Sequence, residues 1–396
     1  MTQSLSQTRR YDLDWLRIIA FGLLIFYHIG MFYVTWDWHI KSDHASHTIE
    51  PLMLLVNPWR LELLFFISGV AMRFMADKMP PLQLAASRFN RLFWPLLFGM
   101  LVIVPPQSFC QVLEHYGFAG SYLDFYCKYL SHYTGWCNDG DGCLIVPTWN
   151  HLWYVAYLLP YCLAFALTYP VLKRLPLAWL ERVPAWLYFV VPWALFFVAK
   201  ITLMTRFGES HAFVGDWYVH ASSVGFFLLG ALAAKSDRLF EVARKARWLS
   251  LALGLMAYGI LMAAYFGLVG GGLTKTTGMV LGLILKTQQA IFLIFALLGF
   301  ARQHLANADG PLRRTLTEAI FPFYIIHQTI IVVAAFYLNQ LHMPVVIEAM
   351  ILIGLTVGGC WLTYVVVKAV PLLRPLFGLK FGAGGKATVR GVEATT

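Results

Sequence analysis

The sequence predicts an all-α polytopic membrane protein with about ten transmembrane helices. Hydrophobic residues make up 59% of the 396 residues and charged residues only 13%, against about 25% charged residues in soluble globular domains. Aromatic residues reach 16% and include 14 Trp and 19 Tyr, the two types that gather at membrane–water interfaces. This composition excludes a soluble enzyme, and it also excludes a disordered chain, which requires low hydrophobicity.

Ten apolar stretches are long enough to cross a bilayer, since about 20 apolar residues at 1.5 Å each span its hydrocarbon core. The predicted spans are 14–35, 59–76, 92–112, 149–171, 185–204, 217–234, 248–267, 276–300, 317–341 and 345–370. No small-residue cleavage site ends the first stretch, so we expect it to remain as a span. The sequence shows no internal repeat, which disfavours a transporter built from two related halves.

Positive charge is unevenly divided between the two predicted sides of the membrane. Most of the 30 Lys and Arg residues fall at the N-terminus, in alternate loops and in the C-terminal tail, whereas the loops of the opposite side hold Lys41, Arg60, Lys128, Arg206 and Lys275. By the positive-inside rule, both termini are predicted to be cytoplasmic. An anionic inner leaflet and an anionic cytosolic ligand account for the net charge of +10, so no nucleic acid partner is needed.

The outer loops contain the cysteines and histidines that could form local sites. Cys137 and Cys143 lie in the long loop between spans three and four, in an oxidising compartment if the orientation is right. Their separation in sequence allows a disulfide, but the distance between their Cα atoms decides it, so the sequence leaves the bond open. His39, His44 and His47 lie in the first outer loop. Their spacing matches no standard metal motif, so we predict a solvated loop and no metal site.

Three other histidines fall inside or at the edge of predicted spans: His28, His151 and His327. Ionisable groups in a span are costly and indicate a function by default. The alternative is a neutral imidazole that is hydrogen-bonded to a neighbouring carbonyl.

The first span carries a distinctive charge pattern. Asp14 and Arg17 are three residues apart, so they can pair at the cytoplasmic end of the helix. His28 follows eleven residues after Arg17, which places it about 16 Å deeper and close to the same helix face. One face thus presents a cation at the inner surface and a proton acceptor deeper in the membrane. That arrangement suits a ligand with an anionic head and a reactive tail.

Five segments in this order resemble the acyltransferase 3 family of integral membrane acyltransferases. They are Arg17 and His28 eleven positions apart, Phe65-Phe66-Ile67-Ser68-Gly69, Arg88-Phe89-Asn90-Arg91, His151-Leu152-Trp153-Tyr154, and Phe323-Tyr324-Ile325-Ile326-His327. The resemblance covers residues 11–378 as one transmembrane domain, followed by a flexible cytoplasmic tail at 379–396. Within the family, Trp36-Asp37-Trp38-His39 and Pro371-Leu372-Leu373-Arg374 are most similar to the glucan biosynthesis protein C branch of succinyltransferases.

The resemblance implies transfer of an acyl group, succinyl or acetyl, from cytosolic acyl-CoA to a hydroxyl of a cell-envelope or periplasmic glycan, in the bacterial inner membrane. Arg17, Arg88 and Arg91 are expected to bind the CoA phosphates, because the planar guanidinium fork matches phosphate. Alternatively, they are ordinary positive-inside charges. An alcohol needs a base in the transition state, and His28 is the expected general base. A covalent acyl-His intermediate remains open, as does the oligomeric state, with a homodimer as one alternative.

Five further residues are expected near the acceptor. His151 and Trp153 approach the acceptor channel, where Trp153 either stacks on a sugar or sits in an interfacial aromatic belt. His327 and Tyr324 orient the acceptor or polarise the thioester carbonyl. Glu62 is expected to hold a histidine tautomer.

Lys286 lies near the middle of the eighth span and is followed by Thr287, Gln288 and Gln289. An uncompensated Lys at the centre of a bilayer costs about 2.5–3.5 kcal/mol on insertion scales, so the sequence predicts that it faces the protein interior. Its partner would be an anionic group, either the distal carboxylate of a succinyl donor or a carboxylate in another span.

A transporter or exporter without covalent chemistry would account for ten spans and buried polar residues equally well. It would not account for the Arg17 and His28 pattern above a cytosolic loop with two arginines. Loss of the acyl-CoA thioester distinguishes the enzyme from the transporter.

Overall fold

The computed structural model describes residues 9–138 and 142–381, which are almost entirely helical. The α-helices are α1 (Tyr11–Tyr33), α2 (Glu50–Val56), α3 (Arg60–Ala76), α4 (Pro81–Phe98), α5 (Pro105–Tyr116), α6 (Tyr122–Leu130), α7 (Trp153–Leu172), α8 (Leu187–Ala199), α9 (Thr205–Phe207), α10 (Trp217–Ala233), α11 (Asp237–Tyr265), α12 (Lys275–His304), α13 (Pro311–Asn339) and α14 (Val345–Ala369). Short 3₁₀ segments are η1 (His47–Ile49), η3 (Asn150–Leu152), η4 (Leu177–Arg182) and η6 (Pro375–Phe377), and π-helical turns are η2 (Gly99–Ile103) and η5 (Lys200–Met204). Two two-residue strands, β1 (Cys137–Asn138) and β2 (Gly142–Cys143), form a small antiparallel hairpin.

The predicted membrane spans correspond to helices in the structure. Within the described residues, nine helical segments are long and apolar enough to cross a membrane, and the remaining predicted span corresponds to α10, a shorter apolar helix. The third span is longer than predicted, because α4, η2 and α5 form one continuous segment over Pro81–Tyr116. The all-α polytopic fold is therefore confirmed, with α10 falling just short of the usual length.

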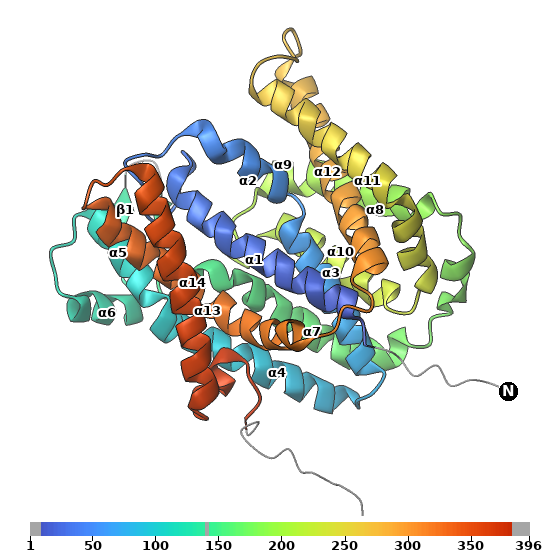
Figure 1. Ribbon diagram of the computed structural model, residues 1–396, viewed down its shortest axis with the longest axis horizontal. Helices are drawn as coiled ribbons and strands as arrows, with labels where there is room; N and C mark the ends of the chain where they lie inside the picture. The colour runs from blue at the N-terminus through green and yellow to red at the C-terminus, as the bar shows by residue number, and fades with distance from the viewer. Residues whose placement is uncertain (1–8, 139–141, 382–396) are drawn as a thin grey trace, which may run out of the picture.

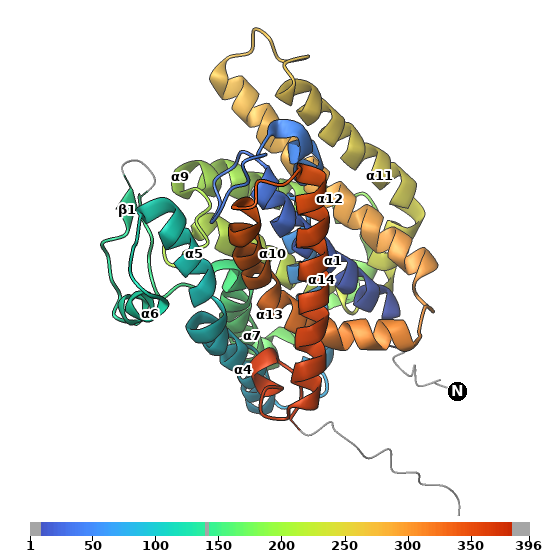
Figure 2. The ribbon, with the colours of Figure 1, turned by 60° about the vertical axis from the view of Figure 1, so that its left-hand side comes forward.

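The helices pack around a core formed by α1, α3, α7 and α13 (Figure 1). Helix α10 packs along α3, α4 packs along α7, and α14 packs on the outside of α13. Helices α11 and α12 pair with each other and project from one corner of the molecule in both views (Figures 1 and 2). Helices α5 and α6 lie beside the small hairpin at the other side (Figure 2).

The close contact between α3 and α10 depends on two glycines. A Cβ atom on Gly69 would overlap the backbone carbonyl of Phe227, and one on Gly230 would overlap the carbonyl of Phe66. Small residues allow helix backbones to approach in this way, as is common in membrane proteins. Gly69 follows Ser68, which lines a cavity described below, so this contact also fixes one wall of the site.

We expect Gly69→Ala to lower the stability of the protein by about 1–3 kcal/mol, the cost of overpacking a tight interface. The matched control is Gly22→Ala in α1, where an added Cβ meets no atom within 4 Å. Thermal unfolding of both variants in the same detergent measures the difference. Equal transition temperatures for the two variants would contradict this account of the α3–α10 contact.

The start of α1 differs from the sequence prediction. Asp14 does not pair with Arg17 but with Arg9 at 2.9 Å and with Arg313 at 2.5 Å. Arg313 is 2% exposed and also binds Asp309 at 2.8 Å. A buried guanidinium requires carboxylate partners, so Arg313 recruits Asp14 from the neighbouring helix. The predicted Asp14–Arg17 pair is therefore wrong, and the side chain of Arg17 is available for another partner.

The disulfide that the sequence left open is present, joining Cys137 and Cys143 across the β1–β2 hairpin with their Cα atoms 4.0 Å apart. Of the predicted tail at 379–396, residues 382–396 lie outside the described residues.

Candidate active site

Two cavities lie toward opposite ends of the same helices. The first, here called the arginine cavity, has a volume of about 540 Å³, and the second, the histidine cavity, about 440 Å³. Helix α1 contributes Arg17 to the first and His28 to the second. The antiparallel helix α3 contributes in the reverse order, with Arg60 in the histidine cavity and Met75 in the arginine cavity.

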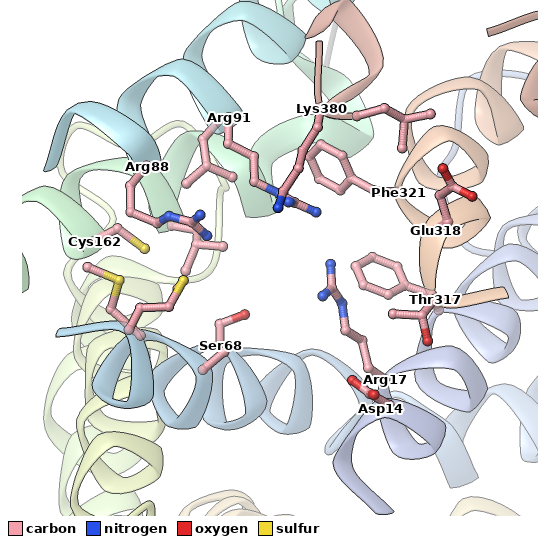
Figure 3. Close-up of a pocket in the computed structure, with 18 of the residues that line it drawn as sticks. Asp14, Arg17, Ser68, Arg88, Arg91, Cys162, Thr317, Glu318, Phe321 and Lys380 are labelled. Carbon is pink, nitrogen blue, oxygen red and sulfur yellow. The ribbon is translucent and has the colours of Figure 1, made fainter. Parts of the chain in front are cut away.

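Three arginines point into the arginine cavity from two sides. Arg88 and Arg91 come from α4, one helical turn apart, and Arg17 faces them from α1 (Figure 3). The hydroxyl of Ser68 points into the same space from α3 (Figure 3). The one-turn spacing of the two α4 arginines is the reason that both reach one ligand site.

These three arginines carry uncompensated positive charge. None of the ion pairs among the described residues includes Arg17, Arg88 or Arg91. The Nε of Arg88 is buried without a hydrogen-bond partner. The carboxylate of Glu318 in the same cavity is bound to Tyr364 and Lys368. The arrangement fits a ligand with several negative charges, for which arginine is the preferred partner.

Three of the other four cations that line the arginine cavity already have partners, whereas the fourth, Lys380, takes part in no ion pair among the described residues. Arg9 pairs with Asp14, Arg314 with Asp309, and Arg374 donates to the carbonyl of Lys368. Hydrogen bonds from Arg314 and Arg313 hold the pKa of Asp309, which lies in the loop before α13, well below its usual value. Apart from Lys380, the cations of this cavity that have neither a carboxylate nor a carbonyl partner among the described residues are therefore the three arginines that the sequence predicted for phosphate binding.

In the histidine cavity, the protonation of His28 is fixed by its neighbour His327. Nδ1 of His327 lies 2.7 Å from the carbonyl oxygen of Tyr324, which can only accept, so Nδ1 carries the proton. In a neutral ring, Nε2 of His327 is then an acceptor, and it lies 2.8 Å from Nδ1 of His28. His28 must therefore donate from Nδ1, and its lone pair is on Nε2.

His28 lines the histidine cavity, whereas His327 lies behind it. His327 is 0% exposed and borders neither cavity, and the two rings stack with their centroids 5.0 Å apart. His151 lines the cavity, contacts the ring of His327 edge-on at 5.0 Å, and donates from Nε2 to the carbonyl of Ile325. The three histidines predicted from the sequence are thus brought together. His28 and His151 both line the cavity, but Nδ1 of His151 lies 3.5 Å from the amide nitrogen of Gln107, whereas Nε2 of His28 has no hydrogen bond among the described residues.

An aromatic cluster separates the two cavities. It consists of Phe21, Phe65, Tyr154 and Tyr324, with ring centroids 4.7–6.1 Å apart for the contacting pairs. Phe21 and Tyr154 border the arginine cavity, and Phe65 borders the histidine cavity. The hydroxyl of Tyr154 lies 2.7 Å from that of Ser68.

Tyr324 differs from its predicted role as a residue that contacts substrate. It is 1% exposed, borders neither cavity, and its hydroxyl donates to the carbonyl of His151 at 2.6 Å. It therefore joins α13 to the start of α7 and supports the positions of two histidines.

Glu62 and Trp153 both line the histidine cavity, and their contacts differ from the expectation. The tautomer of His28 is fixed through His327 rather than by Glu62. The ring of Trp153 stacks on His211, with centroids 4.0 Å apart, so this neighbour occupies one of its faces.

The prediction that Lys286 faces the protein interior is wrong. Lys286 is exposed on α12 and borders neither cavity. The buried face of α12 at this level carries Thr287 and Gln289, whose side chains donate to the backbone carbonyls of Leu283, Leu54 and Leu55. Backbone acceptors thus satisfy the polar patch, and the side chain of Lys286 is exposed.

Sequence reasoning missed several residues of the histidine cavity. His39, assigned to a solvated loop, donates from Nδ1 to Gln111 at 2.8 Å and accepts from Gln328 at 2.9 Å. Burial lowers the pKa of His39 below its ordinary value. Gln328 also donates to Gln107 at 3.1 Å. Gln107 and Gln328 lie inside predicted apolar spans. This was the sequence signal that could have found the cluster, because buried amides require hydrogen-bond partners.

Arg60 and Glu209 also line the histidine cavity. Arg60 was predicted to be one of the outer cations, and no role was predicted for Glu209. Within the described residues, no group of three or more His, Cys, Asp or Glu side chains is placed to hold a metal ion.

The sequence comparisons identify the family of the chain. No curated protein and no solved structure matches it. The model of the acyltransferase 3 family, described as an acyltransferase domain, matches residues 10–365, a range that contains the unpaired arginines and the three histidines. This polytopic membrane protein therefore belongs to the acyltransferase 3 family.

Proposed function

We propose that the protein is an acyl-CoA-dependent O-acyltransferase that moves a succinyl or acetyl group from cytosolic acyl-CoA to a hydroxyl of a cell-envelope glycan. One observation carries this proposal. A single helix, α1, carries an unpaired arginine, Arg17, in one cavity and His28 in the other, and Arg88 and Arg91 of α4 face Arg17. Eleven residues separate Arg17 from His28, which corresponds to about 16 Å along that helix.

The arginine cavity supports CoA as the carrier of the acyl group. Arg17, Arg88 and Arg91 offer three guanidinium groups without carboxylate partners, and CoA carries several phosphate charges. A phosphate that bound there would satisfy the buried Nε of Arg88. The acyl end of the donor would extend past the aromatic cluster toward His28.

The chemistry follows from the tautomer of His28. Nε2 of His28 takes the proton of the acceptor hydroxyl while the oxygen attacks the thioester carbonyl. The resulting imidazolium retains its Nδ1–H bond to His327. The bond between the carbonyl carbon and sulfur then breaks, and the CoA thiolate leaves with the proton from the His28 imidazolium. The products are an ester and free CoA, and His28 returns to its neutral form.

The histidine cavity supports a polyhydroxylated acceptor. It is lined by Glu62, Glu209, Asn57, Ser222 and Ser223. Carboxylate and amide groups accept and donate the hydrogen bonds that sugar hydroxyls need. We place this cavity on the outer side of the membrane, because the cation distribution assigns both termini to the cytosol.

Purified protein in lipid nanodiscs tests the function directly. It is mixed with acetyl-CoA or succinyl-CoA, with and without a glucan, and free thiol and glucan mass are followed. We expect thiol release that depends on the acceptor, together with acylated glucan. Binding of the donor without loss of the thioester would overturn the enzyme in favour of a transporter.

His327 is proposed as a positioning residue, and its variants test that role. We expect His327→Leu to lower turnover by roughly one to two orders of magnitude, the scale at which orienting partners of functional histidines act, with little change in donor KM. His327→Gln should recover part of this loss, because its amide oxygen can accept from Nδ1 of His28. Equal losses in the two variants would indicate a role in packing alone.

A further inference from the structure

Arg60 is a buried cation at the start of α3 that lines the histidine cavity. Its side chain is 5% exposed. The guanidinium carbon lies 3.4 Å from the centroid of the Tyr27 ring, and Nη1 donates to the side-chain oxygen of Asn57 at 2.8 Å. Both contacts hold the guanidinium plane in one orientation.

No carboxylate lies within ion-pair distance of Arg60 in the described chain, and Glu62 and Glu209 interact with its charge only from farther away. The Nε of Arg60 is buried without a hydrogen-bond partner. No ion pair in the described ranges includes Arg60, although Glu62 and Glu209 line the same cavity. Glu209 is instead paired with His211 at 3.3 Å.

An arginine that is buried without a close carboxylate is costly to the folded protein, because its desolvated charge is only partly compensated. A guanidinium with an unused N–H beside a cavity fits an incoming carboxylate through charge-assisted hydrogen bonds. Arg60 also lies next to the reacting group, since the Tyr27 ring that it covers precedes His28 in α1.

We infer that Arg60 binds a carboxylate of the substrate beside His28, an inference that rests on the proposed function. Two sources can supply this group: the acyl chain of a donor derived from a dicarboxylic acid, or an acidic sugar of the acceptor. A dicarboxylic donor would carry anions at both ends, and the chain offers unpaired arginines in both cavities, with His28 in the same cavity as Arg60. The partner of a donor carboxylate, a role predicted for Lys286, is thus assigned to Arg60.

The first arm of the test measures binding without reaction. The probes are two thioethers, S-(3-carboxypropyl)-CoA and S-butyl-CoA, which differ by a carboxylate in place of a methyl group. If the donor supplies the carboxylate, we expect the wild type to prefer the carboxylated probe by roughly ten- to a hundredfold. Arg60→Gln should remove that preference and leave binding of S-butyl-CoA unchanged, which also reports that the variant is folded. Arg60→Lys should retain part of the preference.

The second arm measures acetyl transfer from acetyl-CoA to a neutral glucose oligosaccharide and to one that contains glucuronic acid. If the acceptor supplies the carboxylate, Arg60→Gln should impair only the reaction with the acidic oligosaccharide. The matched control in both arms is Arg206→Gln, an exposed arginine that lines neither cavity.

The outcomes separate this inference from the proposed function. A preference lost in either arm supports Arg60 as a carboxylate site and identifies the source. Equal loss with all substrates, or no selective effect of Arg60→Gln in either arm, overturns it. If no thioester is cleaved but Arg60→Gln still abolishes the preference for the carboxylated probe, the proposed reaction fails and the carboxylate site stands.

Discussion

Replacing His28 by alanine is expected to abolish acyl transfer while the protein still inserts and binds CoA. Positioned base catalysis contributes roughly 10²–10⁴ in rate, and His28 presents its available Nε2 to the histidine cavity. The phosphates of CoA would bind about 16 Å away, at the other end of α1. Turnover should therefore fall by that factor, and the dissociation constant for CoA should change little.

Two measurements test the role of His28: turnover at saturating acyl-CoA, and an equilibrium titration with CoA. His132→Ala, an exposed histidine that borders neither cavity, serves as the control. An active His28→Ala protein would overturn the general-base role. Selective loss of CoA binding would instead assign His28 to the donor site. Acid quenching and peptide mass analysis of the wild type would detect an acyl-His intermediate.

The sequence predicted those parts of the molecule that depend on local pattern. The spans follow from apolar length, and the Arg17 and His28 relation lies within one helix, where spacing determines the relative position of two side chains. The spacing of Arg88 and Arg91 likewise predicted that both reach one cavity. Each of these inferences used residues on a single element.

Contacts between distant elements could not be predicted in the same way. His28 and His327 are 299 residues apart, and no local pattern shows that their rings meet. Asp14 has a nearby cation in Arg17, yet it pairs with Arg313 because that buried guanidinium arrives from α13. Lys286 was assigned to the interior from its depth alone, while backbone carbonyls of neighbouring segments satisfied the polar residues beside it. Tertiary packing decided each case.

Arg60 was not predicted to belong to a binding site. It was counted as one of five cations on the predicted outer side, which agreed with the positive-inside pattern, so no binding role was inferred for it. Its position in the first turn of a predicted span was the usable signal, because an arginine inside a span faces protein and a partner.

Removal of the unpaired arginines should weaken donor binding far more than it slows the acyl-transfer step. We expect Arg88→Ala and Arg91→Ala each to cost about 1.5–3 kcal/mol in CoA affinity, the value of a hydrogen bond to a charged group, and Arg17→Ala to behave similarly. Turnover at saturating donor should change much less, because His28 and its partner His327 are untouched.

Arg9→Ala provides the matched control, because Arg9 lines the same cavity but is 56% exposed and already paired with Asp14. Its loss should change CoA affinity by less than about 1 kcal/mol, as for other exposed ion pairs. Calorimetric titration with CoA at two salt concentrations measures both effects, and screening should weaken binding to the wild type more than to the variants. If all four substitutions leave CoA affinity unchanged, the arginine cavity is not the donor site. In that case the buried Nε of Arg88 requires a different anion.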